Sequence, residues 1–206
     1  NLFQENDASL SPNIAFESTF CENNVFKNNF ADRCNFGFWC GYSKDFLIEN
    51  NRILYNRQAG IAVENGVGFK VARNTFQSCG NGILMWSRQE KIFQEAYPDR
   101  DTCKFWEITE NKFFNNHTGI RIASDQNHGI TDLPQELWGG KQWHPHNNKI
   151  TKNDIQNNRI GIELVRAHKN EIKENILNKN VEANLRLNDS EDNIIVNNIG
   201  SAGAYL

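Results

Sequence analysis

Two glutamates at matching places in a repeated phrase are the first candidates for acid–base chemistry. Glu17 follows the segment NIAF (residues 13–16), and Glu64 follows the segment GIAV (residues 60–63). Two carboxyl groups about 5 Å apart support glycoside hydrolysis with retention, and a separation of about 6.5 to 9.5 Å supports inversion. In such a pair one protonated carboxyl is the general acid, and the other, ionised, activates water or attacks directly.

The phrase that carries these glutamates recurs along the chain. Gly or Asn followed by apolar-x-apolar stands at residues 13–16, 37–40, 60–63, 82–85, 119–122, 161–164 and 184–187. A second phrase, apolar-x-x-Asn-x-apolar, has its anchor at Asn23, Asn51, Asn74, Asn111, Asn153, Asn175 and Asn198. Three of the anchor spacings lie near 22 residues, and the others are that period plus an insertion. An internal repeat of this length is typical of a solenoid.

The elements of this repeat are short strands. Alternation at period two is typical of a strand, and Gly or Asn before it suits a left-handed turn. The 32 asparagines of the sequence favour turns and argue against a helical bundle. Further asparagines five residues after the anchors predict stacked amide ladders between coils. We therefore predict an all-β protein, a right-handed single-stranded parallel β-helix of about seven to eight coils, because stacked coils share one core. The Leu-x-x-Leu-x-Leu pattern of leucine-rich repeats is missing.

Stacking the phrases predicts which side chains share a column. The first and third residues of each strand should face the core, so we expect one inward column of Ile61, Ile83, Ile120, Ile162 and Leu185. On the outside, Glu17 and Glu64 are predicted to share a column with only Gly41 between them, roughly 9 to 10 Å apart at the backbone. The alternative is that they are two solvated glutamates on a polar face.

Two insertions, residues 87–105 and 123–148, follow the same strand of adjacent coils. They should stand side by side as a wall on one edge, and long loops of this kind are usually functional. Aromatic residues on or beside that face, which suit the flat faces of sugar rings, are the candidate substrate-binding residues Trp39, Tyr42, Trp86 and Trp106. The alternative is that these rings pack the loops onto the body of the solenoid.

Other polar residues near the insertions are secondary candidates. Asp101 could replace one glutamate as acid or base. Arg121 could pair with a substrate carboxylate, although it could equally join an Arg–Glu ladder with Glu163 and Arg186. Asp125, which opens the second insertion, is a further candidate for substrate binding beside Arg121. The His144-Pro-His146 segment lacks a fixed third ligand, so we predict no metal site.

Composition excludes several classes of protein. Hydrophobic residues make up 38% and charged residues 23% of the chain, with a net charge of −3. No run is apolar enough to span a membrane, and a nucleic-acid binder would usually carry a basic surplus. The five cysteines form no CxxC pair, which argues against a metal cluster or a dense disulfide scaffold.

The phrases also carry a resemblance. The runs NIAFE (13–17), GFWCGYS (37–43), GIAVENG (60–66) and GILMW (82–86) resemble the parallel β-helix repeat proteins of the NosD-like and pectate-lyase-like group, which includes carbohydrate-binding and sugar-hydrolysing domains. The resemblance implies a secreted, periplasmic or cell-surface protein with a polysaccharide or oligosaccharide partner. We expect no cofactor unless the protein is a lyase, for which Ca²⁺ is possible. No catalytic residue of that group maps onto these motifs.

We therefore expect a carbohydrate-active enzyme, first of all a glycoside hydrolase that uses Glu17 and Glu64. The alternatives are a non-catalytic carbohydrate-binding or structural solenoid, and a uronate lyase or epimerase, in which Ca²⁺ often neutralises the substrate carboxylate. A metal-delivery role lacks soft ligands, because the chain has one Met. We expect residues 1–206 to form one domain that is a segment of a longer chain with further coils, without nucleic-acid partners or a membrane span.

Overall fold

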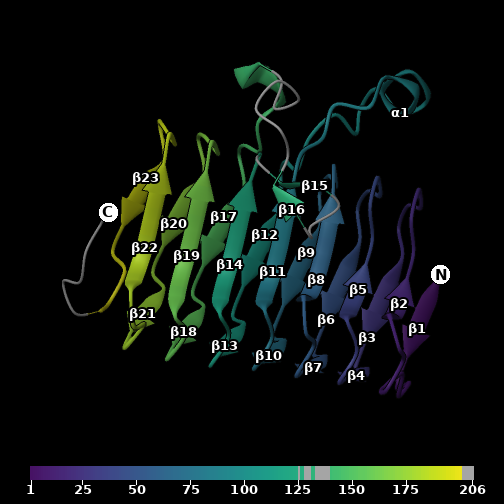
Figure 1. The fold of residues 1–206 in the computed structure, drawn as a ribbon, viewed down its shortest axis with the longest axis horizontal. Coiled ribbons are helices and arrows are strands. Elements are labelled where there is room, and N and C mark those ends of the chain that lie inside the picture. Colours follow the sequence, from purple (N-terminus) through teal and green to yellow (C-terminus); the bar gives the residue numbers. More distant parts are fainter. Residues whose placement is uncertain (125, 128–130, 133–139, 201–206) are drawn as a thin grey trace.

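Three parallel β-sheets run side by side along the whole molecule in the computed structural model (Figure 1). The structure describes residues 1–124, 126–127, 131–132 and 140–200. Each inner coil of the chain contributes one short strand to each sheet, so strands that pair belong to successive coils. The all-β solenoid that the repeat predicts is confirmed.

Sheet A contains the strands β1 (Leu2–Gln4), β3 (Val25–Lys27), β6 (Leu47–Glu49), β9 (Lys70–Ala72), β12 (Glu107–Thr109), β17 (Lys149–Thr151), β20 (Glu171–Lys173) and β23 (Ile194–Val196). Sheet B contains β4 (Phe30–Asp32), β7 (Arg52–Leu54), β10 (Thr75–Gln77), β13 (Lys112–Phe114), β18 (Asp154–Gln156) and β21 (Ile176–Asn178). Sheet C contains β2 (Ile14–Glu17), β5 (Phe36–Trp39), β8 (Ala59–Glu64), β11 (Asn81–Trp86), β14 (Thr118–Ala123), β19 (Ile160–Val165) and β22 (Ala183–Asn188). The insertions add helix α1 (Lys91–Ala96), the short 3-10 helix η2 (Lys141–Trp143) and an antiparallel pair, β15 (Gln126–Asn127) with β16 (Thr131–Asp132).

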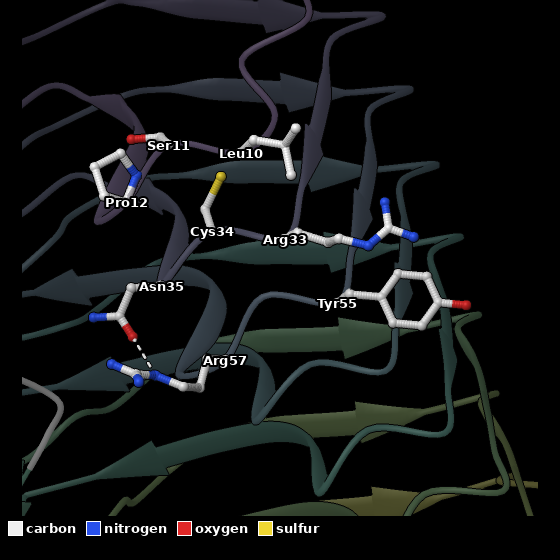
Figure 2. A pocket seen from close by; sticks show the side chains of 8 residues that line it. All are labelled: Leu10, Ser11, Pro12, Arg33, Cys34, Asn35, Tyr55 and Arg57. Atoms are coloured by element: carbon white, nitrogen blue, oxygen red, sulfur yellow. Dashed lines mark hydrogen bonds between the residues drawn. The ribbon is translucent and has the colours of Figure 1, made fainter.

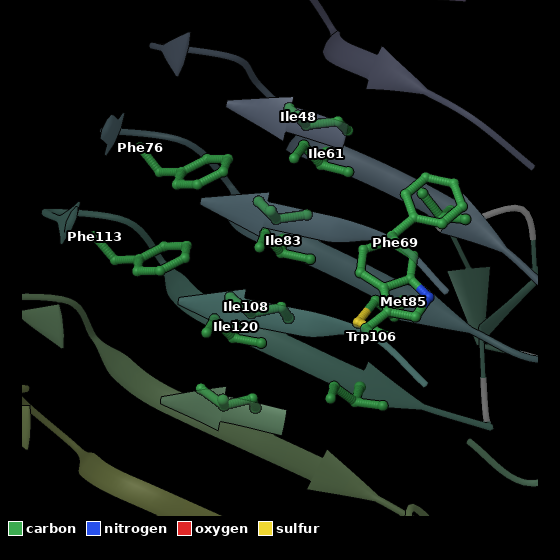
Figure 3. Close-up of a cluster of buried hydrophobic side chains, with 14 of the residues drawn as sticks. Ile48, Ile61, Phe69, Phe76, Ile83, Met85, Trp106, Ile108, Phe113 and Ile120 are labelled. Carbon is green, nitrogen blue, oxygen red and sulfur yellow. The ribbon is translucent and has the colours of Figure 1, made fainter. Parts of the chain in front are cut away.

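The predicted inward column is confirmed. Ile61 pairs with Ile83, Ile83 with Ile120, Ile120 with Ile162 and Ile162 with Leu185, and each of these side chains is at most 1% exposed. Figure 3 shows isoleucines and phenylalanines of neighbouring coils stacked in rows inside the solenoid. The core is therefore continuous from coil to coil, as the stacking of repeats requires.

The predicted register of the first coil is wrong by two residues. Phe16 pairs with Phe38 and Glu17 pairs with Trp39, so Glu17 lies beside Trp39 rather than beside Gly41. The amide ladder likewise continues from Asn51 to Asn29, not to the predicted anchor Asn23. A shift of two residues satisfies the same alternation of side chains, so periodicity alone did not define the register.

Amide ladders connect the coils, as predicted. The longest contains Asn6, Asn29, Asn51, Asn74, Asn111, Asn153, Asn175 and Asn198, each amide donating to the next. A second ladder contains Asn116, Asn158 and Asn180. Such ladders satisfy polar groups that the turns bury, because a buried amide without partners is costly.

The glycines of the repeated phrase are the second residues of sheet C strands and have a different role from the predicted one. They are not in the left-handed region, which in glycine occurs only at Gly68 among the described residues. A Cβ atom at Gly82 would instead lie 2.5 Å from the Gly119 carbonyl oxygen and 2.6 Å from the Phe113 ring. The repeated glycine is therefore required by close packing between coils.

The two insertions begin at the same edge of sheet C, as predicted, because Trp86 and Ala123 are paired in register. The first insertion, which carries α1, folds toward the N-terminal coils, where Lys44 Nζ lies 2.9 Å from Asp99. The described end of the second insertion lies against the C-terminal coils, where Lys141 Nζ lies 2.5 Å from Glu191. The far parts of the two insertions therefore reach toward opposite ends of the solenoid, and the first insertion borders the coil that carries Tyr42. No helix among the described residues is long and apolar enough to span a membrane.

Candidate functional site

The strongest candidate site surrounds Glu64, a buried carboxylate on the outer side of sheet C. Glu64 is the last residue of β8, and its side chain points away from the core, yet the residue is only 5% exposed. The Tyr42 hydroxyl donates a hydrogen bond to Oε1 at 2.8 Å, and Trp86 Nε1 donates one to Oε2 at 3.1 Å. Each carboxylate oxygen thus accepts a hydrogen bond from a neutral donor.

The repeat explains this arrangement. Trp86 is the residue of β11 that pairs with Glu64, and Gly41 is the neighbour on the other side, where a Cβ atom would lie 3.7 Å from the Glu64 Cβ. The predicted contact between Gly41 and Glu64 is confirmed. Tyr42 follows Gly41 with a left-handed backbone, φ 51°, and its backbone N–H donates to the Glu64 carbonyl oxygen at 2.7 Å. Burial, followed by the charge of Glu64, raises the pKa of the Tyr42 phenol, so this hydroxyl is a donor and not a base.

An aromatic cluster fastens the first insertion beside this carboxylate. Phe20 stacks on Tyr42 with ring centroids 5.3 Å apart, and Phe93 of α1 lies 4.8 Å from Tyr42. Tyr97 lies 5.3 Å from Phe20 on the same side. Phe93 and Tyr97 are four residues apart and so share one face of the helical turn.

Arg100 locks the end of this insertion. Arg100 is 4% exposed. Its guanidinium donates to the Tyr42 carbonyl oxygen at 2.7 Å, pairs with Glu22 and lies over the Tyr97 ring. These contacts connect the insertion to the coil that carries Tyr42. The wall on the N-terminal side of Glu64 is therefore a fixed part of the structure.

The two tryptophans of the face differ in exposure. Trp39 is half-buried, whereas Trp86 is fully buried and contacts Trp39 edge to face with centroids 5.6 Å apart. Together with Phe36, Ala62 and Leu84 they form a second hydrophobic cluster on the outside of sheet C. Trp39 can still present part of its ring to a ligand, but the prediction that Trp86 stacks on a sugar is wrong for this conformation, since Trp86 instead orients Glu64.

The predicted pairing of Glu17 with Glu64 lacks its geometric basis. Glu17 belongs to the column of Trp39, two residues along the strand from the column of Glu64. Two coils of about 4.8 Å and two residues of about 3.3 Å put the two backbones roughly 12 Å apart. Glu17 is exposed, whereas Glu64 is buried, so the two carboxyl groups occupy different environments.

The remaining predicted site residues lie apart from Glu64 or are already paired. Asp101 accepts a hydrogen bond from Lys104 Nζ at 2.5 Å. Trp106 is a core residue stacked on Phe69 with its Nε1 donating to a backbone carbonyl, so its predicted role in substrate binding is wrong. Asp125 lies outside the described residues.

The alternative prediction for Arg121 is confirmed. Arg121 pairs with Glu163, which also lies 3.4 Å from Arg186, and Arg186 contacts Glu182 at 3.2 Å. This is the Arg–Glu ladder across neighbouring coils that the columns allowed. The Arg121 guanidinium, which would have paired with a substrate carboxylate, is therefore already paired with Glu163.

No metal centre is evident in the described part of the chain. No group of three or more His, Cys, Asp or Glu residues is placed to hold a metal ion there. His144 and His168 stack with Nδ1 and Nε2 3.0 Å apart, which makes a hydrogen-bonded pair between coils. All five cysteines are free thiols.

Sequence reasoning missed the residues that shape the site. Arg100, Phe20 and Phe93 were not among the predicted residues, although the four-residue spacing of Phe93 and Tyr97 could have indicated a helical face. The second role of Trp86, as a donor to a buried carboxylate, was equally missed. Buried Trp and Tyr usually find a partner for the polar end of the ring, which is the signal that could have revealed it.

Comparison with known proteins agrees with this architecture. Residues 1–95 match the family described as right handed beta helix region, and residues 101–200 match the family described as periplasmic copper-binding protein (NosD). No curated protein matches the sequence. A crystal structure of a mutant of the periplasmic alginate epimerase AlgG superposes with a TM-score of 0.64 at 18% identity, over 88% of this chain and 36% of the epimerase chain. The chain thus spans about a third of that protein, and the likeness concerns the fold. From the stacked sheets and these matches, the chain is a right-handed parallel β-helix repeat protein.

Proposed function

We propose that this protein binds a carbohydrate polymer on the outer face of sheet C, where Trp39 and Glu64 lie beside the first insertion. The observation that carries the proposal is the Glu64 carboxylate, which is buried outside the core between a phenol and an indole. Burying a charge costs free energy, and residues held in this way are concentrated at functional sites.

The surroundings of Glu64 fit a sugar ligand. The half-buried Trp39 ring offers an apolar surface for the C–H face of a pyranose, and a carboxylate accepts hydrogen bonds from vicinal hydroxyl groups. Strands β5 and β8 form a rigid floor, and the insertion that carries Arg100 forms a fixed wall. A site on rigid elements loses little conformational entropy when the ligand binds.

The comparisons favour the same class of ligand. The structure with the similar fold is described as an alginate epimerase, and alginate is a carbohydrate polymer. A periplasmic or extracellular location also belongs to the proposal, because both NosD and AlgG are described as periplasmic.

For the chemistry, glycoside hydrolysis remains the first proposal, with Glu64 as the acid or base. Its predicted partner Glu17 lies in another column. A second catalytic group would therefore have to move toward Glu64 when the ligand binds. The uronate lyase or epimerase is the second candidate, and the likeness to an alginate epimerase favours it. Binding without reaction is the third.

A panel of neutral and acidic polysaccharides tests the proposal, with binding measured by calorimetry. Glu64→Gln keeps the size of the side chain but removes its charge and replaces one acceptor oxygen by an NH₂ donor. It should weaken binding about tenfold or more, because hydrogen bonds to charged groups contribute about 1.5 to 3 kcal/mol. Glu107→Gln, a surface glutamate of sheet A whose side chain is 50% exposed, is the matched control and should bind normally.

The products distinguish the three candidates. New reducing ends indicate hydrolysis, unsaturated ends indicate a lyase, and a changed uronate configuration indicates an epimerase. Equal affinities for the Glu64→Gln and Glu107→Gln variants, with both folded by circular dichroism, would exclude Glu64 from the binding site.

A further inference from the structure

A second candidate site lies at the opposite end of the sheet C strands, where the first coils pass from sheet B to sheet C. A cavity of about 340 Å³ opens there, within the size range of small-ligand pockets. Figure 2 shows the side chains that surround it, among them Leu10, Pro12, Arg33, Cys34, Tyr55 and Arg57. Because Arg57 precedes β8 whereas Glu64 ends it, this cavity is separate from the site proposed above.

The lining of the cavity is cationic. It contains two arginines and no acidic residue, in a chain whose net charge is −3. Arg33 is anchored by a salt bridge to Asp32 and lies over the Tyr55 ring, 5.4 Å from its centroid. The Asp32 charge offsets part of the charge of Arg33, so Arg57 carries most of the uncompensated positive charge.

Arg57 is held in place by an amide and keeps its outer donors. Its Nε donates to Asn35 Oδ1 at 3.2 Å, and the Asn35 amide in turn donates to Asn13 Oδ1 at 3.2 Å. The two terminal nitrogens of Arg57 make no hydrogen bond to any described residue, and the same is true of the Tyr55 hydroxyl. These donors belong to the lining of one cavity, and a guanidinium matches two oxygens of an oxyanion in one plane.

We propose that this cavity binds a small organic anion through its carboxylate, phosphate or sulfate group. The oxyanion would contact Arg57 and the Tyr55 hydroxyl, with Arg33 alongside. The apolar part of the ligand would lie against Leu10, which is 70% exposed, and Pro12. The proposal is independent of the carbohydrate site, because it rests on other residues and another corner of the solenoid.

Cys34 provides a reporter inside the cavity. Its thiol belongs to the lining, and Figure 2 shows its sulfur between Leu10 and Ser11. The residue is 4% exposed, and its Sγ lies 3.5 Å from the carbonyl oxygens of Ala8 and Asp32. A bound anion would cover the approach to this sulfur and slow its alkylation.

The experiment measures the rate of Cys34 alkylation by iodoacetamide with peptide-resolved mass spectrometry. The probes are inorganic phosphate, inorganic sulfate, glucuronate and neutral glucose, each at the same ionic strength adjusted with sodium chloride. At a concentration ten times the dissociation constant, a ligand should slow the reaction about tenfold. Arg57→Gln should raise the dissociation constant about tenfold or more, so the same ligand concentration should slow the reaction at most about twofold. Arg52→Gln is the matched control, since Arg52 lies over Phe30 outside the cavity, and it should behave as the wild type.

Each outcome decides the proposal. Protection by phosphate and sulfate alone supports a tetrahedral anion, and protection by glucuronate but not by glucose supports a carboxylate. Protection by no anion, equal protection by glucose, or undiminished protection in a folded Arg57→Gln variant overturns it.

Discussion

Replacing Asn111 by alanine should destabilise the solenoid strongly. Asn111 lies in the middle of the longest amide ladder and is fully buried. Its Nδ2 donates to Asn153 Oδ1 at 3.0 Å and to the Val71 carbonyl oxygen at 2.8 Å. Its Oδ1 accepts from the Asn74 backbone N–H at 2.9 Å and from the Asn74 amide at 3.0 Å.

The magnitude follows from the groups that Asn111→Ala leaves behind. The Asn74 N–H and one N–H of the Asn74 amide lose their acceptor. The carbonyls of Val71 and Thr109 lose the Asn111 amide as a donor, whereas Asn153 Oδ1 keeps the Asn111 backbone N–H. Each unsatisfied buried group costs about 1 to 3 kcal/mol. We expect the free energy of unfolding to fall by about 4 kcal/mol, which is exceptional for a single substitution.

The matched control is Asn198→Ala at the end of the same ladder. Asn198 also accepts two hydrogen bonds, from Asn175, but it is only half-buried, so water can replace its amide. This variant should lose about 1 kcal/mol in urea unfolding followed by circular dichroism. Equal losses for the two variants, or a loss below about 1 kcal/mol for Asn111→Ala, would refute the reasoning that the ladder satisfies buried groups.

Three further outcomes are expected. Gly82→Ala should lower the free energy of unfolding by about 1 to 3 kcal/mol because its Cβ meets a carbonyl at 2.5 Å, while Gly41→Ala, with nothing nearer than 3.7 Å, should leave urea unfolding unchanged. Burial, then the charge of Lys141, lowers the pKa of His168 below 6.5, so the unfolded state binds the proton more readily. Stability should therefore be lost as pH falls below 6.5 toward the folded-state pKa, and a pH series of melts that is equally steep in His168→Gln would contradict this. Arg100→Ala should make the first insertion sensitive to limited proteolysis while the coils stay resistant, and uniform sensitivity of the whole chain would count against a local anchor.

The fold was largely predictable because stacking imposes one rule on every coil. Ile61, Ile83 and Ile120 occupy the same place in the phrase, and identical positions must share a column when coils pair in parallel. Glu17 shows the limit of that rule: a shift by two residues keeps the alternation, so only backbone pairing revealed that it lies beside Trp39.

The candidate site was predictable only in part. Glu64, Tyr42 and the edge from which the insertions begin follow from the columns. The burial of Trp86 does not, because an outward position on a solenoid can be solvated or covered, and the sequence pattern is the same in both cases. Arg100 was not predicted for a related reason, since a single arginine in a long insertion carries no periodic signal.

Soaking crystals with an oligosaccharide of the polymer that binds tests the central proposal most directly. The proposal predicts density for sugar rings on the outer face of sheet C, against Trp39 and within hydrogen-bonding distance of the Glu64 carboxylate. Ordered sugar bound only at another surface, with this face empty, would contradict it.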